Sequence, residues 1–119
     1  MDLSLFLNQA YTELTLARKA LYVCVEDEVY AEEQLKAAEA DHLRIQGTPE
    51  SQLTCKNQEG REAQLRQLTL NERVQLTGAR KGKRLAELDL KMAEDKMRLA
   101  RDTIKLSELE AVEIMRMTK

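Results

Sequence analysis

The feature that most constrains the fold of this chain is a seam of mostly apolar residues, spaced alternately three and four apart, over residues 3–45. This spacing keeps one row of side chains on a single face of an α-helix, as in a coiled coil. The seam residues are Leu3, Leu7, Ala10, Leu14, Ala17, Leu21, Cys24, Glu28, Ala31, Leu35, Ala38, His42 and Ile45. One row is mostly leucine, interrupted by Glu28 and His42, and the other is mostly alanine. The spacing predicts one unbroken helix over 3–45.

The segment after this helix carries residues that stop helices. Gly47 suits the position just past a helix end, and Pro49 cannot continue a helix. Asn57 is a favourable N-cap, followed by acids in what would be the first turn of the next helix. We therefore predict that residues 46–57 form the connection between two helices.

Residues 58–117 carry a second helical pattern, which is clearest over 86–114. Its seam is formed by Ala86, Leu90, Ala93, Met97, Ala100, Ile104, Ser107, Ala111 and Ile114. Two antiparallel helices with alanine at every seventh position approach closely, and the large row of each fills the space beside the small row of the other. The sequence therefore predicts an all-α fold, a long antiparallel helical hairpin with an Ala/Leu coiled-coil seam, as a single helical domain over 1–119.

Two glycines, Gly78 and Gly82, interrupt the second predicted helix. Each costs about 1 kcal/mol in a helix interior relative to alanine, so the pair predicts a kink at 78–82. In the alternative, residues 58–77 form a separate helix that turns at the glycines. Of the two, we favour one long helix over 58–117, bent at 78–82.

The composition agrees with long, partly solvated helices. Aromatic residues are only 3% of the chain, which leaves little for a β-sandwich, whereas charged residues reach 34%. A net charge of −2 and a hydrophobic fraction of 43% argue against disorder. No apolar run reaches the length of a membrane span, and the N-terminus lacks a basic leader. We expect a cytoplasmic protein without membrane contact, in which Cys24 and Cys55 are reduced thiols.

A second apolar stripe follows the helix from residue 85, well away from the Ala86 seam. Its members are Leu85, Leu88, Met92, Leu99, Leu106 and Leu109. A hairpin of two helices cannot cover both faces, and exposed stripes of this size mark interfaces. We predict a homo-oligomer, most simply a dimer that forms a four-helix arrangement. The alternative is a monomeric three-helix bundle in which residues 61–77 fold back over the stripe.

The sequence offers no constellation for catalysis. It has no phosphate-binding loop and no readable Ser/His/Asp or Cys/His arrangement. His42, the only histidine, falls on the first seam, and the acidic cluster over 26–33 lacks the Glu-x-x-His motif of carboxylate metal sites. We expect no enzyme activity, no cofactor and no metal site. Glu28, on the seam, is expected to meet a basic residue of the facing helix and to fix the register.

The charges divide along the sequence. Residues 1–50 hold ten acids and four bases, whereas residues 56–84 hold eight bases and three acids. A basic segment can neutralise the phosphates of a nucleic acid or pair with acids of another helix or subunit. The candidate contacts with nucleic acid or another anionic partner are Lys56, Arg61, Arg73, Arg80, Lys81, Lys83 and Arg84. The sequence pI of about 5.5 and the scarcity of aromatics favour internal pairing over a dedicated nucleic-acid interface.

Residues 55–65 read Cys-Lys-Asn-Gln-Glu-Gly-Arg-Glu-Ala-Gln-Leu. This segment resembles a motif, approximately G-K-N-A-E-E-R-K-A-x-L, that lies between two long helices in small phage and prophage helical-hairpin proteins of unassigned function. Cys55 stands where that motif usually has glycine, and Gly60 where it usually has glutamate. The resemblance implies a hairpin shape, a phage origin, and a gene context of phage replication and recombination.

Together these features predict a non-catalytic, phage-type helical-hairpin protein that acts as an oligomeric structural or accessory interaction factor. A further protein partner is a second expectation. The alternative is a nucleic-acid-associated accessory protein of phage replication or recombination that uses the basic segment 56–84. If the resemblance holds, the protein acts in the cytoplasm of a bacterial host cell.

Overall fold

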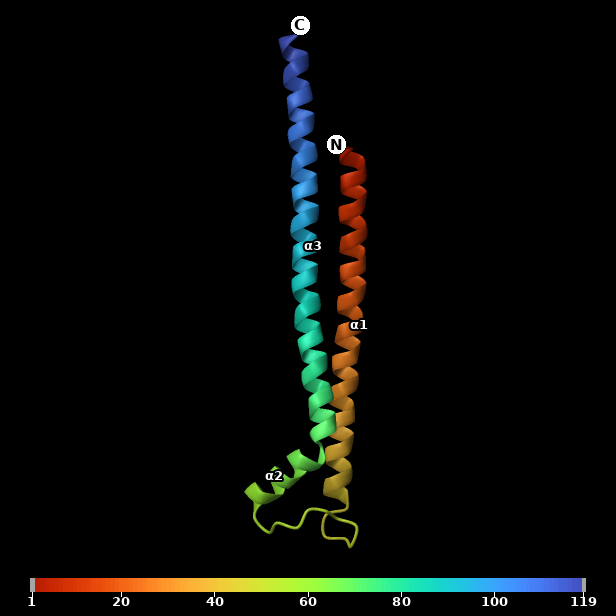
Figure 1. Ribbon diagram of the computed structural model, residues 1–119, viewed down its shortest axis with the longest axis vertical. Helices are drawn as coiled ribbons and strands as arrows, with labels where there is room; N and C mark the ends of the chain where they lie inside the picture. The colour runs from red at the N-terminus through yellow and green to blue at the C-terminus, as the bar shows by residue number, and fades with distance from the viewer. Residues whose placement is uncertain (1, 119) are drawn as a thin grey trace. The chain divides into compact units, whose positions relative to one another are not determined.

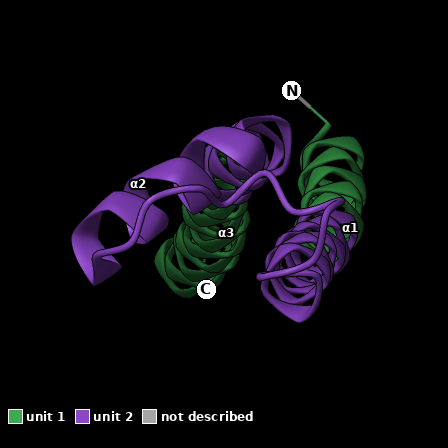
Figure 2. Cartoon of the chain, turned by 90° about the horizontal axis from the view of Figure 1, so that it is seen from below, with its two compact units in different colours: residues 1–22, 85–119 green, residues 23–84 purple. Residues whose placement is uncertain are grey.

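A computed structural model describes residues 2–118. These residues form three α-helices and no strand: α1 (Leu3–Arg44), α2 (Gln58–Leu68) and α3 (Leu70–Met117) (Figure 1). By their internal contacts the residues divide into two compact units, where the sequence predicts one domain. Unit 1 comprises Met1–Tyr22 and Leu85–Lys119, and unit 2 comprises Val23–Arg84 (Figure 2). In each unit a part of α1 packs against a part of α3, which confirms the prediction of an all-α antiparallel helical hairpin.

Unit 1 holds the apolar core of the seam. Its buried residues are Ala10, Leu14, Ala93, Met97 and Ala100, with Phe6, Leu7, Ala17 and Leu90 packed against them. Ala10 and Ala100 are both 0% exposed, so the small rows allow the two helices to approach closely. Full burial of a leucine or methionine side chain contributes about 1.5–3 kcal/mol, so Leu14 and Met97 are the main apolar contributions to this core.

The start of α1 is capped by Asp2. Its Oδ1 accepts hydrogen bonds from the backbone N–H groups of Ser4, at 3.0 Å, and Leu5, at 3.2 Å. This cap satisfies two of the donors that a helix leaves unpaired at its first turn, and it places a negative charge at the positive end of the helix dipole.

Within unit 1, α3 extends past the first residue of α1 (Figure 1). Every residue from 105 to 118, the C-terminal overhang, is exposed. The predicted seam of α3 is therefore covered only as far as Ile104, and Ser107, Ala111 and Ile114 face solvent. Part of the reason is length, because α3 has 48 residues and α1 has 42.

Unit 2 contains the end of α1, the connection, α2 and the start of α3. Ala31 and Leu76 are buried between α1 and α3, and Leu53 of the connection is also buried. The helix α1 ends at Arg44, one residue before the predicted end, and the chain turns at Gly47, whose φ of 84° lies in the left-handed region that favours glycine.

The second helical segment breaks at Thr69, so residues 58–117 do not form the one long helix that the sequence predicts. Thr69 has φ −104° and ψ 21°, and its hydroxyl donates a 2.8 Å hydrogen bond to the Leu65 carbonyl. The side chain of Arg73 then donates to the Thr69 hydroxyl at 3.0 Å, which fixes the corner between α2 and α3. By contrast, α3 runs through Gly78 and Gly82 without a break, because Leu76 and Ala86 on either side are buried against α1. The alternative of a separate helix over 58–77 fails as well, since α2 ends at Leu68.

None of the helices over residues 2–118 has a stretch long and apolar enough to cross a membrane.

Candidate interaction site

The second apolar stripe lies on the outside of α3. Its six residues are each between 54% and 69% exposed, namely Leu85, Leu88, Met92, Leu99, Leu106 and Leu109. We call this set the outer stripe. Four of its members repeat at intervals of seven residues, which is the spacing of one row of a coiled-coil seam. The helix α3 thus carries one buried seam toward α1 and one exposed seam.

The three-helix alternative required residues 61–77 to fold back over the outer stripe. Residues 70–77 belong to α3 itself, in the same continuous helix as the stripe. A helix cannot fold back on itself, so about half of the proposed covering segment, residues 70–77, is unavailable for that role.

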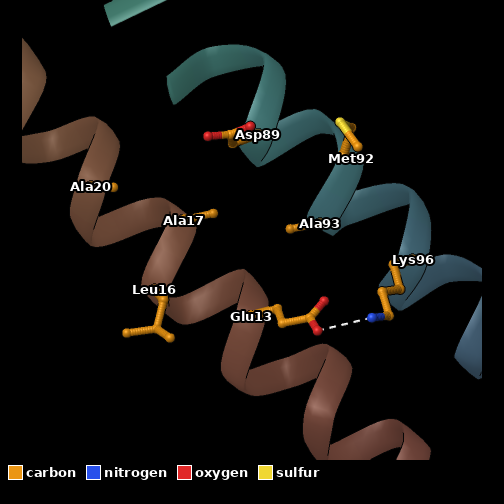
Figure 3. Close-up of a pocket in the computed structure, with 8 residues that line it drawn as sticks. All are labelled: Glu13, Leu16, Ala17, Ala20, Asp89, Met92, Ala93 and Lys96. Carbon is orange, nitrogen blue, oxygen red and sulfur yellow. Dashed lines mark hydrogen bonds and ion pairs between the residues drawn. The ribbon is translucent and has the colours of Figure 1, made fainter. Parts of the chain in front are cut away.

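A shallow groove of about 480 Å³ lies beside the outer stripe in unit 1, between α1 and α3 (Figure 3). Its lining consists of Glu13, Leu16, Ala17, Ala20, Asp89, Met92, Ala93 and Lys96. Ala17 and Ala93 point toward one another between the helices, and the exposed side chains of Leu16 and Met92 lie on either side (Figure 3). The groove therefore has a floor of small residues between two apolar ridges.

Charged groups flank this groove. Lys96 Nζ pairs with Glu13 Oε1 at 2.8 Å across the two helices (Figure 3). Asp89, one heptad before Lys96, has no ion pair or hydrogen bond from its carboxylate to any residue in the range 2–118. The face thus presents a carboxylate that is free to accept a cation from another molecule.

The basic segment pairs largely with α1. Three ion pairs in unit 2 join α3 to the acids of α1: Arg73–Glu39 at 2.8 Å, Arg80–Glu32 at 3.4 Å and Lys83–Glu28 at 3.5 Å. Glu28 does meet a basic residue of the facing helix, as the sequence predicted. Its side chain is only 18% exposed, so the pair with Lys83 replaces an apolar layer of the seam.

The remaining four predicted contacts lie at the corner and on α3. Arg61 Nε donates to the Asn57 carbonyl at 3.4 Å, which ties it to the start of α2. Lys56, Lys81 and Arg84 are exposed and have no ion pair with any described residue. Of the seven basic candidates, three are thus neutralised by α1, and the others are divided between the corner and α3.

The corner segment is held by local hydrogen bonds. Asn57 Oδ1 accepts from the Gly60 N–H at 2.6 Å and so caps α2. Gln64 Oε1 accepts from the N–H groups of Thr54, at 2.9 Å, and Cys55, at 3.1 Å, while its amide donates to the Thr54 hydroxyl at 2.8 Å. These contacts fix the end of the connection against α2.

Cys55 and Gly60, the two departures from the resembled motif, lie against each other. A Cβ atom on Gly60 would be 2.8 Å from the Cβ of Cys55 and 2.7 Å from Asn57 Oδ1. Glycine at position 60 therefore leaves room for both the Asn57 side chain that caps α2 and the Cys55 side chain, a packing that sequence patterns do not indicate.

Among residues 2–118, no group of three or more His, Cys, Asp or Glu side chains is placed to hold a metal ion. Cys24 and Cys55 are both free thiols. Sequence reasoning also missed two features that depend on the register of α1 against α3: the Glu39–Arg73–Thr69 cluster and the groove. In the sequence these side chains stand only as positions beside the seam. Those positions predict a contact between α1 and α3 only when the register of the two helices is known.

Comparisons with known protein families, with curated proteins and with solved structures find no match to this chain.

Proposed function

We propose that this protein is a non-catalytic helical-hairpin factor that self-associates, with a dimer as its simplest form, and acts by binding as a structural or accessory component. The observation that carries the proposal is the outer stripe, whose six large apolar side chains are all more than half exposed. Contiguous apolar surface at coiled-coil spacing favours burial against another helix.

The origin of the protein is also part of the proposal. The corner segment 55–65 resembles the motif of phage and prophage hairpin proteins, and the observed hairpin is the shape that this resemblance implies. We infer a phage protein that acts in the cytoplasm of a bacterial host. A protein partner other than its own copies would bind through the same outer stripe.

The distribution of ion pairs weakens the nucleic-acid alternative. Glu39, Glu32 and Glu28 neutralise three of the seven basic candidates. Phosphate binding by those three bases would have to compete with carboxylates already in contact. A nucleic-acid interface would therefore depend on Lys56, Lys81 and Arg84, which have no ion pair with any described residue. A gel shift with single- and double-stranded DNA at low salt tests this alternative, and a salt-dependent shift would favour it over our proposal.

Light scattering of the full chain at micromolar concentration tests the proposed function. We expect the mass of a dimer or larger oligomer, and the double variant Leu99→Lys, Leu106→Lys should have the mass of a monomer with unchanged helicity. The control Ser107→Lys, Ala111→Lys adds the same two charges to another exposed face of α3 and should leave the oligomer intact. A monomer mass for the native chain would refute the proposal.

A further inference from the structure

We propose that the groove face of unit 1 binds a second copy of this chain, with the two α3 helices packed antiparallel about a two-fold axis beside Met92 and Ala93. This inference rests on the self-association proposed above and specifies its geometry. The proposed contact surface consists of the groove and its two apolar ridges, together with Leu85 and Leu99 of the outer stripe.

The shape of the face suits a helix of another copy. Leu16 and Met92 are 60% and 69% exposed on the two ridges, and the alanines between them leave a hollow at the level of the backbone. A side chain from a second hairpin fills such a hollow in the way that a knob fills a hole in a coiled coil. The ridge residues of each copy thereby lose their exposure to water, which is the main favourable term in association.

The charges of the face are self-complementary about the proposed axis. Asp89 and Lys96 lie three and four residues on either side of the Met92–Ala93 position, so an antiparallel copy brings Asp89 of one chain opposite Lys96 of the other. The two-fold axis repeats the contact between Asp89 and Lys96, so it occurs twice in the dimer. Asp89 has no partner within residues 2–118, and the dimer supplies one, while Lys96 comes to lie between Glu13 of its own chain and Asp89 of the second copy.

The apolar row of the face has the same symmetry. Leu85 and Leu99 are each seven residues from Met92, about 10 Å along the helix. Antiparallel packing therefore places Leu85 opposite Leu99 of the second copy, and Met92 opposite its own equivalent. With the axis at Met92 the apolar layers coincide, and Asp89 is offset from Lys96 of the second copy by one residue, about 1.5 Å along the helix, so one isologous arrangement accommodates both sets of contacts.

A parallel dimer on this face would be disfavoured. Its two-fold axis would run along the helices, so Asp89 and Lys96 of the two copies would lie on opposite sides of the apolar row, and Asp89 would gain no partner. A lipid surface is also a poor occupant, because Glu13 and Asp89 place carboxylates beside the apolar ridges. The antiparallel copy is the arrangement in which the described side chains find both apolar and charged partners.

Disulfide trapping between cysteine variants tests this geometry. In a Cys24→Ala, Cys55→Ser background of the full chain, Leu85→Cys and Leu99→Cys are made separately and oxidised alone and as an equal mixture. We expect a several-fold excess of cross-linked dimer in the mixture over either variant alone, with the mixed dimer identified by mass spectrometry. Glu94→Cys, on the opposite edge of α3, is the matched control and should not cross-link with either variant.

The outcomes separate this inference from the proposed function. Self-cross-linking of each variant without a mixed product would show a parallel dimer, which overturns the inference and leaves self-association standing. A dimer mass by light scattering with no cross-link at either position would place the interface elsewhere, such as the C-terminal overhang, and would also overturn it. A monomer mass for the cysteine-free background and the native chain would overturn both proposals.

Discussion

In unit 1 the seam between α1 and α3 is lined by alanine, leucine and methionine, whereas in unit 2 Glu28 and Lys83 occupy seam positions. Apolar burial is non-directional and depends little on salt, while an ion pair is directional and is screened. The same heptad spacing thus builds two kinds of contact between α1 and α3. Unit 1 holds most of the buried apolar residues and one ion pair between the helices, Glu13–Lys96, whereas unit 2 has three such ion pairs, one of them within the seam. The ion pairs of unit 2 therefore contribute most to the choice of one register.

The register function follows from the positions of the charges. A slip of α3 by one heptad would bury Glu28 and Lys83 against apolar residues, and a buried charge without a partner is costly. The alanine and leucine rows of unit 1 repeat every seven residues and discriminate less between such slips. The comparison shows that apolar burial comes mainly from unit 1, whereas the choice of register comes mainly from the ion pairs of unit 2.

The largest effect should follow from shortening a core side chain of unit 1. Leu14→Ala removes a side chain that is 6% exposed and leaves a cavity beside Met97, so we expect the free energy of unfolding to fall by about 2–5 kcal/mol. Urea unfolding followed by circular dichroism measures the change. Leu5→Ala, at a position that is 55% exposed, is the control and should change stability by less than about 0.5 kcal/mol. Equal effects of the two variants would show that the unit 1 seam is not the apolar core.

Replacing the polar layer of unit 2 by an apolar one should sharpen the comparison. Lys83→Leu leaves Glu28 without its partner, and we expect a loss of about 1–3 kcal/mol. The double variant Glu28→Leu, Lys83→Leu continues the apolar seam and should be at least as stable as the native chain. The four proteins form a double-mutant cycle in urea unfolding. If the double variant has a lower free energy of unfolding than either single variant, the Glu28–Lys83 pair is retained for stability, which contradicts a role in register alone.

A smaller effect distinguishes the corner of unit 2 from the open helix. Gly60→Ala brings a Cβ into contact with Asn57 Oδ1 and Cys55, so the cap of α2 is lost and stability should fall by about 1 kcal/mol. Gly78→Ala is the matched substitution in α3, where nothing lies within 4 Å of the new Cβ, and it should gain about 0.5–1 kcal/mol. Thermal unfolding of both variants checks the signs. If both variants raise or both lower the thermal stability, the contacts of Gly60 with Asn57 and Cys55 do not determine the result of the substitution.

The hairpin was predictable because the heptad spacing is a property of the chain itself. No seam residue from Leu3 to Ile45 is exposed, and the second seam is covered as far as Ile104. The break at Thr69 was not predictable from local preference. Glycine signals a weak helix wherever it stands, but the hydrogen bonds of Thr69 and Arg73 and the ion pair with Glu39 decide where the helix ends. Of these contacts, the ion pair between Arg73 and Glu39 forms only when α1 and α3 are side by side.

The candidate site divides in the same way. The outer stripe was predictable from spacing, since six large apolar residues recur on one face of a helix whose other face is already used. The groove was not, because Leu16 and Met92 become neighbours only through the register of the two helices. The need of Glu28 for a base was likewise readable, whereas its partner Lys83 depends on the length and path of the connection.

Hydrogen exchange at low and high salt tests the central claim most directly, that unit 2 depends on ion pairs and unit 1 on apolar burial. The Arg73–Glu39 and Arg80–Glu32 pairs, whose side chains are between 31% and 52% exposed, contribute about 0.2–1 kcal/mol each, whereas the more buried Glu28–Lys83 pair is screened less by salt. Between 0.05 and 1 M salt, amides of residues 23–44 and 70–84 should therefore exchange up to about tenfold faster, the equivalent of about 1.4 kcal/mol. Amides of residues 6–21 and 86–104 should change by less than about twofold. An equal change in both sets of amides, or no change in either, would contradict the account.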